Sequence, residues 1–413
     1  MPTLTPIIVI MIAVTMAVMN NAMAITREKH TTDSSPEASA LRHAGAVLSI
    51  DLGALQKNWQ TYKKAVSKSK NCAVGAVIKA GGYGLDARHV GVALGVVGCK
   101  TFFVATIDEG IELRSVIGPD AEIFILGCVI GGNETDLAQY ALSPVLNSME
   151  DISVWKKFSS TSANMVAAAL HIDTGINRLG LGAGDVKTIA KNPDIISGVN
   201  LSLVMSHLAC ADEQANPMNE TQLASFKDAI SSINGLVGVR ASIANSSGVF
   251  LGGQYHLDLV RPGVALYGVN PTPDKANPMD QVVRLQGKIL QVRKIDTPDS
   301  VGYGATHKAA GPERIATVAA GYADGILRSL SNNGVAYVGK YPAPYVGRVS
   351  MDLITINVSA IPEKIAHAGA LVDLIGPSNT VDDMAARSGT IGYEILTNLG
   401  SRYGRVYVGG AKI

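Results

Sequence analysis

The chain has 413 residues, of which 47% are hydrophobic and 17% are charged, and its formal net charge is +1. This length is enough for two domains with their own hydrophobic cores. A charge so close to zero argues against nucleic acid as a partner, because phosphate backbones are bound by basic surfaces.

The first residues form a segment distinct from the rest. Ile7 to Met19 is almost entirely apolar, Ala22-Met23-Ala24 is a small-x-small cleavage pattern, and residues 26–39 are polar. The apolar run is short for a bilayer span, so we predict a secretory signal peptide over residues 1–24 and a flexible leader over residues 25–44. No Lys or Arg precedes the run, and the alternatives are a retained membrane anchor or a misassigned start codon. A cleaved leader predicts a periplasmic or secreted protein without a stable membrane span; the alternative location is the cytoplasm.

The four cysteines are Cys72, Cys99, Cys128 and Cys210. Their spacing matches no zinc pattern, and we expect no metal. Cys72 and Cys99 each precede one of two neighbouring predicted strands, so a disulfide between them is plausible in an exported protein. Four buried free thiols are the alternative.

Short apolar runs alternate with helix-like amphipathic stretches from Val74 onward. This alternation predicts an α/β fold in which eight parallel strands close into a TIM-like (β/α)₈ barrel over residues 45–270. A doubly wound open sheet is the alternative, but no G-x-G-x-x-G follows the first strand. The eight predicted strands are Val74–Lys79, Thr101–Ala105, Glu122–Leu126, Ser143–Leu146, Ala167–Ile172, Leu201–Ser206, Val239–Ala244 and Leu257–Val260.

The pattern changes past about Asn270, where shorter alternating segments are separated by Gly and Pro. These segments predict a mostly antiparallel β domain over residues 271–413. Ala46–Asp51 reads as a further strand that either domain could hold. The predicted strands of the second domain are Gly287–Ile295, Arg314–Ala320, Val335–Val338, Tyr345–Val349, Leu353–Val358 and Ala370–Leu374.

The first barrel strand ends on Lys79, and a glycine-rich turn carrying Tyr83 follows at once. A lysine amine held at a strand end can form a Schiff base with a carbonyl or with pyridoxal phosphate. Glycines beside it let backbone N–H groups approach a phosphate. A solvated surface lysine is the ordinary alternative.

Polar residues also follow four of the other predicted strands, at the same end of the predicted barrel. In such barrels the functional groups gather at the carboxyl ends of the strands. Each residue alone is an ordinary core or loop residue, but their convergence on one mouth predicts an active site. In chain order they are Lys79, Asp173 with Arg178, His207, Asn245 with Ser246, and Arg261.

These residues lie in motifs that resemble the pyridoxal-phosphate-dependent alanine racemase family, whose fold is a barrel followed by a β domain (fold type III of the pyridoxal phosphate enzymes). The resemblance runs from Ala46 to the C-terminus in family order and spacing. The motifs are Lys79 with its Gly/Tyr turn, Asp173–Gly180, Ser206-His207, Asn245–Gly248, Arg261–Gly268, Val301–Ala305, Gly321–Gly325, Gly347–Asp352 and Gly392–Ile395.

The resemblance implies a two-base mechanism. Lys79 serves one face of the substrate Cα and Tyr303, from the second domain, serves the other. A tyrosine needs help to act as a base, because a free phenol titrates near pH ~10; His207 and Arg261 match the family's cationic and hydrogen-bonding neighbours.

Arg261 matches the residue that faces the pyridine nitrogen of the cofactor. A guanidinium only donates hydrogen bonds, so this nitrogen would be unprotonated and the ring a weaker electron sink. That favours racemisation over transamination.

The resemblance also implies the remaining contacts. Tyr303, Met351 and Asp352 match residues given across the interface of a head-to-tail homodimer with shared active sites. The implied cofactor-binding residues are Lys79, Tyr83, Arg178, His207, Asn245, Ser246, Arg261, Gly263, Val264 and Tyr393, with Tyr83, Ser246 and Tyr393 on the phosphate. The implied substrate-binding residues are Arg178, Met351, Asp352 and Tyr322.

Three positions depart from the most familiar family pattern. His171 stands where many members have a lysine carbamylated by CO₂; it either positions Arg178 itself or is a packed core histidine. Gly81-Gly82 stands where Asn-Ala is frequent, and we expect a looser link to Tyr83. Ser242 stands where a histidine often supports the arginine.

The resemblance implies racemisation of L- and D-alanine, supplying D-alanine for peptidoglycan. Export would favour the alternative of a broad-specificity amino-acid racemase. A decarboxylase of basic amino acids on the same fold predicts a carboxylate at the position of Arg261. A non-enzymatic pyridoxal-phosphate-binding protein would end after the barrel, whereas this chain continues for well over a hundred residues.

Overall fold

The structure is a computed structural model of the chain and describes residues 42–127, 129, 131–162 and 166–410. By its internal contacts the chain divides into Met1–Ala44 and Gly45–Ile413. The predicted signal peptide, most of the predicted leader and Cys128 lie outside the described residues, so these predictions remain predictions. The account below concerns the second unit.

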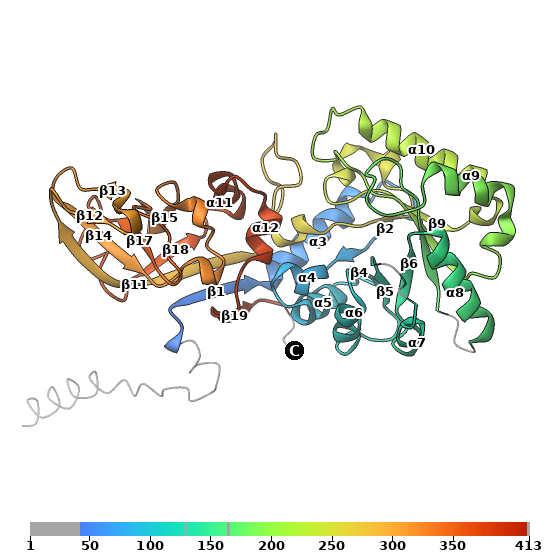
Figure 1. Cartoon of the computed structure of the whole chain (residues 1–413), viewed down its shortest axis with the longest axis horizontal. Coiled ribbons are helices and arrows are strands. Elements are labelled where there is room, and N and C mark those ends of the chain that lie inside the picture. The colour runs from blue at the N-terminus through green and yellow to red at the C-terminus, as the bar shows by residue number, and fades with distance from the viewer. Residues whose placement is uncertain (1–41, 128, 130, 163–165, 411–413) are drawn as a thin grey trace, which may run out of the picture. The chain divides into compact units, whose positions relative to one another are not determined.

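The predicted barrel is confirmed, and all eight predicted strands are present (Figure 1). Seven of them form one parallel sheet in chain order, from β3 to β9. The parallel pair β2–β10 and the bonds from Asp258 N to Ala241 O and from Arg261 N to Ala244 O join its two ends. The strands are β2 (Ala73–Val74), β3 (Ala76–Val77), β4 (Thr101–Val104), β5 (Glu122–Ile125), β6 (Ser143–Leu146), β7 (Ala168–His171), β8 (Leu201–Met205), β9 (Arg240–Ser242) and β10 (Leu259–Val260).

The first predicted strand is divided into β2 and β3 at Gly75. A side chain there would place its Cβ 3.0 Å from the carbonyl oxygen of Thr101 on the neighbouring strand. The close approach of two backbones therefore favours glycine at this point. The division lets one strand pair with β10 through its first half and with β4 through its second half.

Helices follow most of the barrel strands, and several begin at side-chain caps. Thr106 accepts a hydrogen bond from Glu109 N, and Ser148 accepts one from Asp151 N, which satisfies free N–H groups of the first turn. Only the 3₁₀ turns η3 (Gly248–Leu251) and η4 (Gly253–Tyr255) link β9 to β10. The helices are α3 (Leu52–Ala65), α4 (Lys79–Tyr83), α5 (Ala87–Val96), α6 (Ile107–Arg114), α7 (Glu134–Gln139), α8 (Met149–Thr161), α9 (Ala183–Lys191) and α10 (Met218–Ser232).

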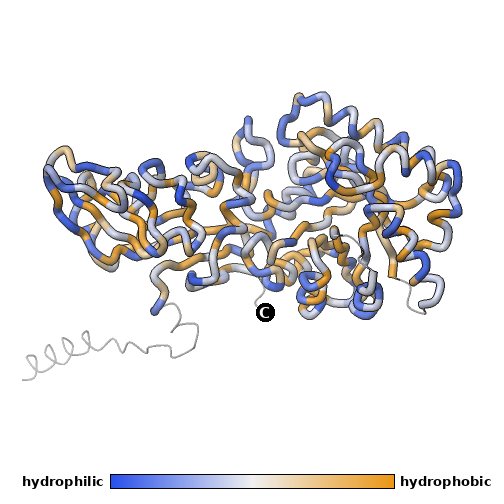
Figure 2. Tube along the Cα trace, in the orientation of Figure 1, coloured by the Kyte–Doolittle hydropathy of each residue, from blue (hydrophilic) through white to orange (hydrophobic). Residues whose placement is uncertain are grey.

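The barrel has two apolar layers. Side chains from β4 to β8 and from β10 fill its interior, and a larger cluster packs between the strands and the helices. In Figure 2 apolar residues run along the strands, and most hydrophilic residues lie on the helices and loops around them. The interior layer consists of Phe103, Phe124, Val145, Ala169, Leu203, Met205 and Leu259.

The second domain is the predicted, mostly antiparallel β structure. Its largest sheet has the strand order β16-β15-β18-β11-β1-β19, with β14 and β17 branching from β11. The strands are β1 (Ala46–Asp51), β11 (Val283–Ile295), β12 (Ser300–Val301), β13 (His307–Lys308), β14 (Glu313–Val318), β15 (Val335–Val338), β16 (Tyr341–Pro344), β17 (Ile354–Asn357), β18 (Leu371–Ile375) and β19 (Gly404–Val408); the helices are α11 (Val381–Ser388) and α12 (Gly392–Thr397).

The strand at Ala46–Asp51, which the sequence left unassigned, belongs to this second sheet. It pairs antiparallel with β11 and parallel with β19. Residues 46, 48 and 50 are buried and residues 47, 49 and 51 are partly exposed, which is the alternation of a strand with one face on a core. The first strand of the described chain, β1, therefore lies in the same domain as the last strand, β19.

The predicted strand Tyr345–Val349 is wrong. The strand lies earlier, at Tyr341–Pro344, and Tyr345 makes only an isolated bridge to Ile356. Prolines at positions 342 and 344 argued against a strand, because proline cannot donate a backbone hydrogen bond. They are tolerated because β16 is at the edge of the sheet.

The Cys72–Cys99 disulfide, one of the two alternatives for the cysteines, is not formed. Both cysteines are buried and free, and Cys210 is free and partly exposed, so burial of all the thiols is also not observed. Cys72 Sγ instead lies 3.4 Å from the carbonyl oxygen of His256. Within the described residues, no helix is long and apolar enough to cross a bilayer, and no cluster of acidic, His and Cys side chains suits a metal ion.

Candidate active site

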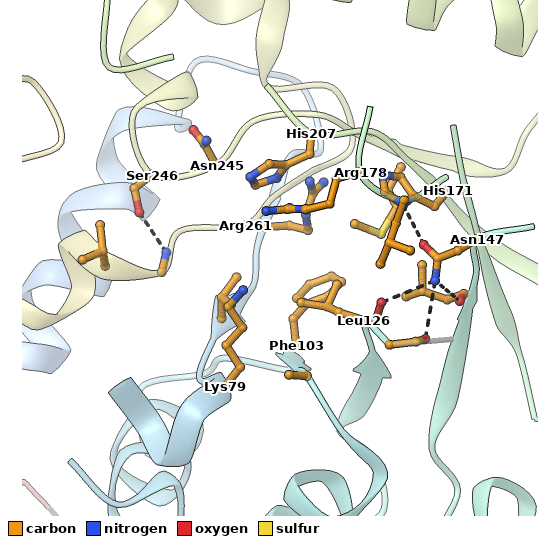
Figure 3. Close-up of a pocket in the computed structure, with 18 of the residues that line it drawn as sticks. Lys79, Phe103, Leu126, Asn147, His171, Arg178, His207, Asn245, Ser246 and Arg261 are labelled. Carbon is orange, nitrogen blue, oxygen red and sulfur yellow. Dashed lines mark hydrogen bonds between the residues drawn. The ribbon is translucent and has the colours of Figure 1, made fainter. Parts of the chain in front are cut away.

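The carboxyl ends of the barrel strands surround a cavity of about 470 Å³ (Figure 3). This volume is typical of a small-molecule site. It is lined by His171 and by all ten residues implied to bind the cofactor: Lys79, Tyr83, Arg178, His207, Asn245, Ser246, Arg261, Gly263, Val264 and Tyr393.

The turn after Lys79 is left-handed. From Ala80 to Gly84 every φ angle is positive, between 54° and 80°. Glycine adopts this conformation freely, whereas Ala80 and Tyr83 are strained in it by roughly 1–2 kcal/mol each. The expected looseness at Gly81-Gly82 is therefore wrong: the turn holds Tyr83 5% exposed and stacked on Tyr267 at 4.5 Å between ring centroids.

Glu109, which the sequence did not single out, holds this turn in place. One carboxylate oxygen accepts from Ala80 N at 2.6 Å, and the other accepts from Ala105 N at 2.7 Å. A carboxylate that accepts two backbone N–H groups makes strong, charge-assisted bonds. Glu109 thereby joins the end of β4 to the residue that follows Lys79.

The pKa of Lys79 is lowered, first by burial and then by the positive charge of Arg178, while Glu109 acts in the opposite direction. Both lowering effects disfavour the ammonium form. A neutral amine is the form that attacks a carbonyl or takes up a proton. The cavity therefore prepares Lys79 for covalent or base chemistry.

Arg261 is held by neutral acceptors. Its Nη2 donates to the carbonyl oxygen of Ser206 at 2.5 Å and its Nη1 donates to Ser242 Oγ, which itself donates to Leu259 O. Burial lowers the pKa of Arg261 to about 9, which leaves the group charged at neutral pH. Among the described residues no carboxylate pairs with Arg261, so the cavity keeps this positive charge. Ser242 thus takes over the support that the sequence comparison placed on a histidine.

A cradle for an anion lies between Tyr83 and the start of the 3₁₀ helix η5 (Val264–Tyr267). A Cβ at Gly263 would lie 2.6 Å from the Tyr83 hydroxyl oxygen, so any larger residue would have to displace the buried Tyr83 side chain. Ser246 Oγ accepts from Gly263 N at 2.9 Å, and its own hydroxyl proton can still be donated. Burial raises the pKa of Tyr83, which keeps its hydroxyl a donor. Val264 N–H belongs to the first turn of a helix, where N–H groups have no partner within the helix.

The loop between β7 and α9 carries Arg178 on the cavity rim. Asp173 does not line the cavity; its carboxylate accepts from the backbone N–H groups of Gly175, Ile176 and Asn177 at 3.0–3.2 Å and so shapes the loop. Within the described part of the chain, Arg178 makes no hydrogen bond or ion pair. Its guanidinium is therefore free to bind a ligand.

Two histidines of the cavity are neutral. Burial, followed by the charges of Arg261 and Arg178, lowers the pKa of His207 to about 3. Burial and Arg261 lower the pKa of His171 to about 4. His207 therefore adds no positive charge to the cavity, whereas Arg178 and Arg261 line it as cations.

Known proteins match the chain over nearly its whole described length. The family model for the alanine racemase N-terminal domain matches residues 50–271, and that for the alanine racemase C-terminal domain matches residues 282–407. An alanine racemase of Rhodospirillum rubrum is 48% identical over 89% of this chain and 96% of its own length.

The chain belongs to the alanine racemase family. A catabolic alanine racemase of Mesorhizobium japonicum is 43% identical over 95% of this chain and its own full length. The crystal structure of the alanine racemase from Bartonella henselae, with covalently bound pyridoxal phosphate, has a TM-score of 0.84 and 36% identity, covering 88% of this chain and all of that one.

The cavity of this racemase fits pyridoxal phosphate, its cofactor. The buried amine of Lys79 suits the aldehyde, and the hydroxyls and N–H groups beside Gly263 suit the phosphate. Arg261 suits the pyridine nitrogen, since a guanidinium can only donate to it. Phe103, whose ring lies 5.9 Å from the Arg261 guanidinium, adds an apolar surface.

Four residues implied by the family resemblance do not line the cavity. They lie in the second domain and are exposed: Tyr303 (72%), Met351 (54%), Tyr322 (44%) and Asp352 (54% of its side chain). Asp352 forms an ion pair with Arg402 at 2.8 Å. Within one chain the structure therefore brings together the residues predicted to bind the cofactor but leaves Tyr303 outside the cavity that Lys79 lines.

Some cavity residues were missed from the sequence. Asn147 directly follows β6 and occupies the same carboxyl end as Lys79 and His207, so the strand-end argument would have found it. Phe103 is the third residue of the hydrophobic strand β4 and looked like ordinary core. No local signal distinguishes it, because its place under Arg261 depends on strands far apart in sequence.

Proposed function

We propose that this alanine racemase interconverts L- and D-alanine with two bases, Lys79 and Tyr303, the latter supplied by a second copy of the chain. The cavity that gathers Lys79, the phosphate cradle and Arg261 is the observation that carries the proposal. Pyridoxal phosphate would be held by Lys79 at rest; when bound instead to the substrate amine, it would withdraw electrons from the substrate Cα, make its C–H bond acidic and leave the Lys79 amine free. The protein must then take a proton from one face of Cα and return one to the other.

Lys79 is suited to exchange the proton on its own face. It stands on a turn fixed by Glu109, and burial together with Arg178 favours its neutral form. A base near neutral pH is most effective when its pKa lies close to the working pH. Arg178 at the rim would bind the substrate carboxylate and so orient Cα toward the amine.

Arg261 favours racemisation over other reactions of the same fold. Its guanidinium keeps a positive charge where the pyridine nitrogen of the cofactor would lie, and it has no carboxylate partner among the described residues. A decarboxylase of basic amino acids would place an acidic group there, and a non-enzymatic binding protein would not need the second domain. Both alternatives are therefore disfavoured.

A homodimer with shared sites accounts for the residues that lie outside the cavity. Tyr303 and Met351 are large side chains exposed over 72% and 54% of their surface. The second base must approach the face of Cα that Lys79 does not reach. Tyr83 and Tyr393 are the tyrosines among the described residues that line the cavity. Both of these belong to the phosphate end, which leaves Tyr303 of the second copy.

The physiological role is part of this proposal. D-alanine supply for peptidoglycan is the first role, and the catabolic name of one relative makes alanine breakdown a second. The apolar N-terminal segment supports export to the periplasm or medium, where a broad-specificity racemase would be useful; the cytoplasm is the alternative. N-terminal sequencing of the protein from separated cell fractions distinguishes the two locations.

The decisive experiment measures racemisation in heavy water with the holoenzyme. Wild type should convert either enantiomer of alanine and incorporate deuterium at Cα. Lys79→Ala and Tyr303→Phe should each lose nearly all activity, and mixing the two inactive variants should restore part of it if sites are shared. Serine, lysine and arginine are tested alongside; faster turnover of these than of alanine would establish the broad-specificity alternative.

A further inference from the structure

A buried ring nitrogen without a partner lies in the wall of the cavity. His171 ends β7, lines the cavity and is 8% exposed. Its Nδ1 lies 2.7 Å from Asn147 Oδ1, whereas its Nε2 has no hydrogen-bond partner within the described residues. Buried polar atoms of this kind are rare and costly, so a specific role is expected.

The neighbours of Asn147 determine which nitrogen of His171 carries the proton. Asn147 Nδ2 donates to the carbonyl oxygens of Val145 at 2.9 Å and of Leu126 and Gly127 at 3.4 Å. Its Oδ1 is therefore the atom that faces His171, and Nδ1 must donate to it. In the neutral ring Nε2 then has a lone pair and can only accept a hydrogen bond.

Arg178 is the donor that matches this acceptor. It lines the same cavity, across from Lys79 in Figure 3, and its charge acts on His171. The loop that carries Arg178 returns to the end of β7, where Leu181 N donates to the carbonyl oxygen of His171 at 2.8 Å. Asp173 does not compete for Arg178, because its carboxylate already accepts from backbone N–H groups. Arg261 does not compete for His171 Nε2, because its two terminal nitrogens donate to Ser242 and Ser206.

We propose that His171 is a positioning residue whose Nε2 accepts a hydrogen bond from the Arg178 guanidinium and directs it toward the substrate carboxylate. The inference rests on the proposed function. Asn147, His171 and Arg178 then form a relay from the end of β6 to the rim. A neutral acceptor orients the arginine without cancelling its charge, so the guanidinium remains a full cation for the carboxylate.

The test compares variants that remove the ring nitrogens with one that replaces the acceptor. In the holoenzyme, His171→Phe keeps a ring of similar size and His171→Ala removes it, whereas His171→Gln places an amide oxygen near the position of Nε2. We measure KM and kcat for alanine and the Kd of propionate, a carboxylate without an amine, by absorbance titration. His171→Phe and His171→Ala should raise KM and Kd about tenfold or more with a smaller change in kcat. His171→Gln should keep both constants within about threefold of wild type.

A double-mutant cycle separates positioning from packing. In an Arg178→Ala background, His171→Phe should change the propionate Kd by less than about twofold, because the group through which it acts is gone. An equal loss in both backgrounds, or no loss in either, overturns the proposal. His256→Phe is the matched control: His256 is 5% exposed, lies outside the cavity and should leave both constants unchanged.

The cycle also distinguishes this inference from the proposed function. If wild type does not racemise alanine, the proposed function fails, whereas the propionate titration still reports on the His171–Arg178 pair. If wild type racemises alanine and the cycle shows no coupling, the inference alone fails.

Discussion

Substitution of Gly263 tests the phosphate cradle most directly. An alanine Cβ would lie 2.6 Å from the Tyr83 hydroxyl oxygen, and ordinary contact begins at 3.4 Å, so the hydroxyl would have to move by 3.4 − 2.6 = 0.8 Å. Tyr83 has little room, because it is 5% exposed and stacked on Tyr267. Such a movement would take the hydroxyl away from the phosphate, and a hydrogen bond to a charged group is worth about 1.5–3 kcal/mol, which corresponds to a roughly 10- to 150-fold weaker Kd for pyridoxal phosphate.

The assay is titration of the apoprotein with pyridoxal phosphate, followed by absorbance. Tyr83→Phe removes the clashing oxygen, so Gly263→Ala should cost less than about threefold in that background. Gly95→Ala is the control: no atom lies within 4 Å of its Cβ, so cofactor affinity should not change. Wild-type affinity in a folded Gly263→Ala protein would refute the assignment of the cradle to the phosphate.

Three further predictions concern stability, measured by urea unfolding of the apoprotein. The pKa values of His207 and His171, about 3 and about 4, lie below the usual 6.5, so the unfolded state binds protons first; stability should be full above about pH 7.5 and fall by up to about 2 kcal/mol per histidine as the pH drops to about 5, and a flat profile would contradict their burial. Gly84→Ala places a Cβ 2.5 Å from Leu396 O at a φ of +80° and should cost about 3 kcal/mol or more, whereas a loss below 1 kcal/mol would show that the turn can relax. Glu109→Gln leaves one of two N–H groups without its acceptor and should cost about 1.5–3 kcal/mol; no loss would mean that water replaces the carboxylate.

The barrel was predictable because its rules are local and repetitive. Short apolar runs separated by helix-length connectors predict parallel strands, and parallel strands bring their carboxyl ends to one mouth. Lys79, His207, Ser246 and Arg261 follow such strands, and the structure places all four around one cavity.

Features that depend on distant contacts were not predictable from the residues alone. The left-handed turn includes Ala80 and Tyr83, two residues with no preference for positive φ, and it is held by a carboxylate 29 positions away in the chain. Nothing near Glu109 in sequence announces this bond. Strand β16 was misplaced because its two prolines look like a strand breaker until its position at the sheet edge is known.

The pairing of β1 between β11 and β19 has a consequence for how the chain is made. Protein synthesis supplies β1 first and β19 more than 350 residues later, whereas the intervening barrel strands neighbour one another in order. On the ribosome the barrel can assemble while both edges of β1 still lack partners, and unpaired edges are sites of aggregation. Nascent chains of this protein should therefore depend on chaperones until the last few residues have been translated.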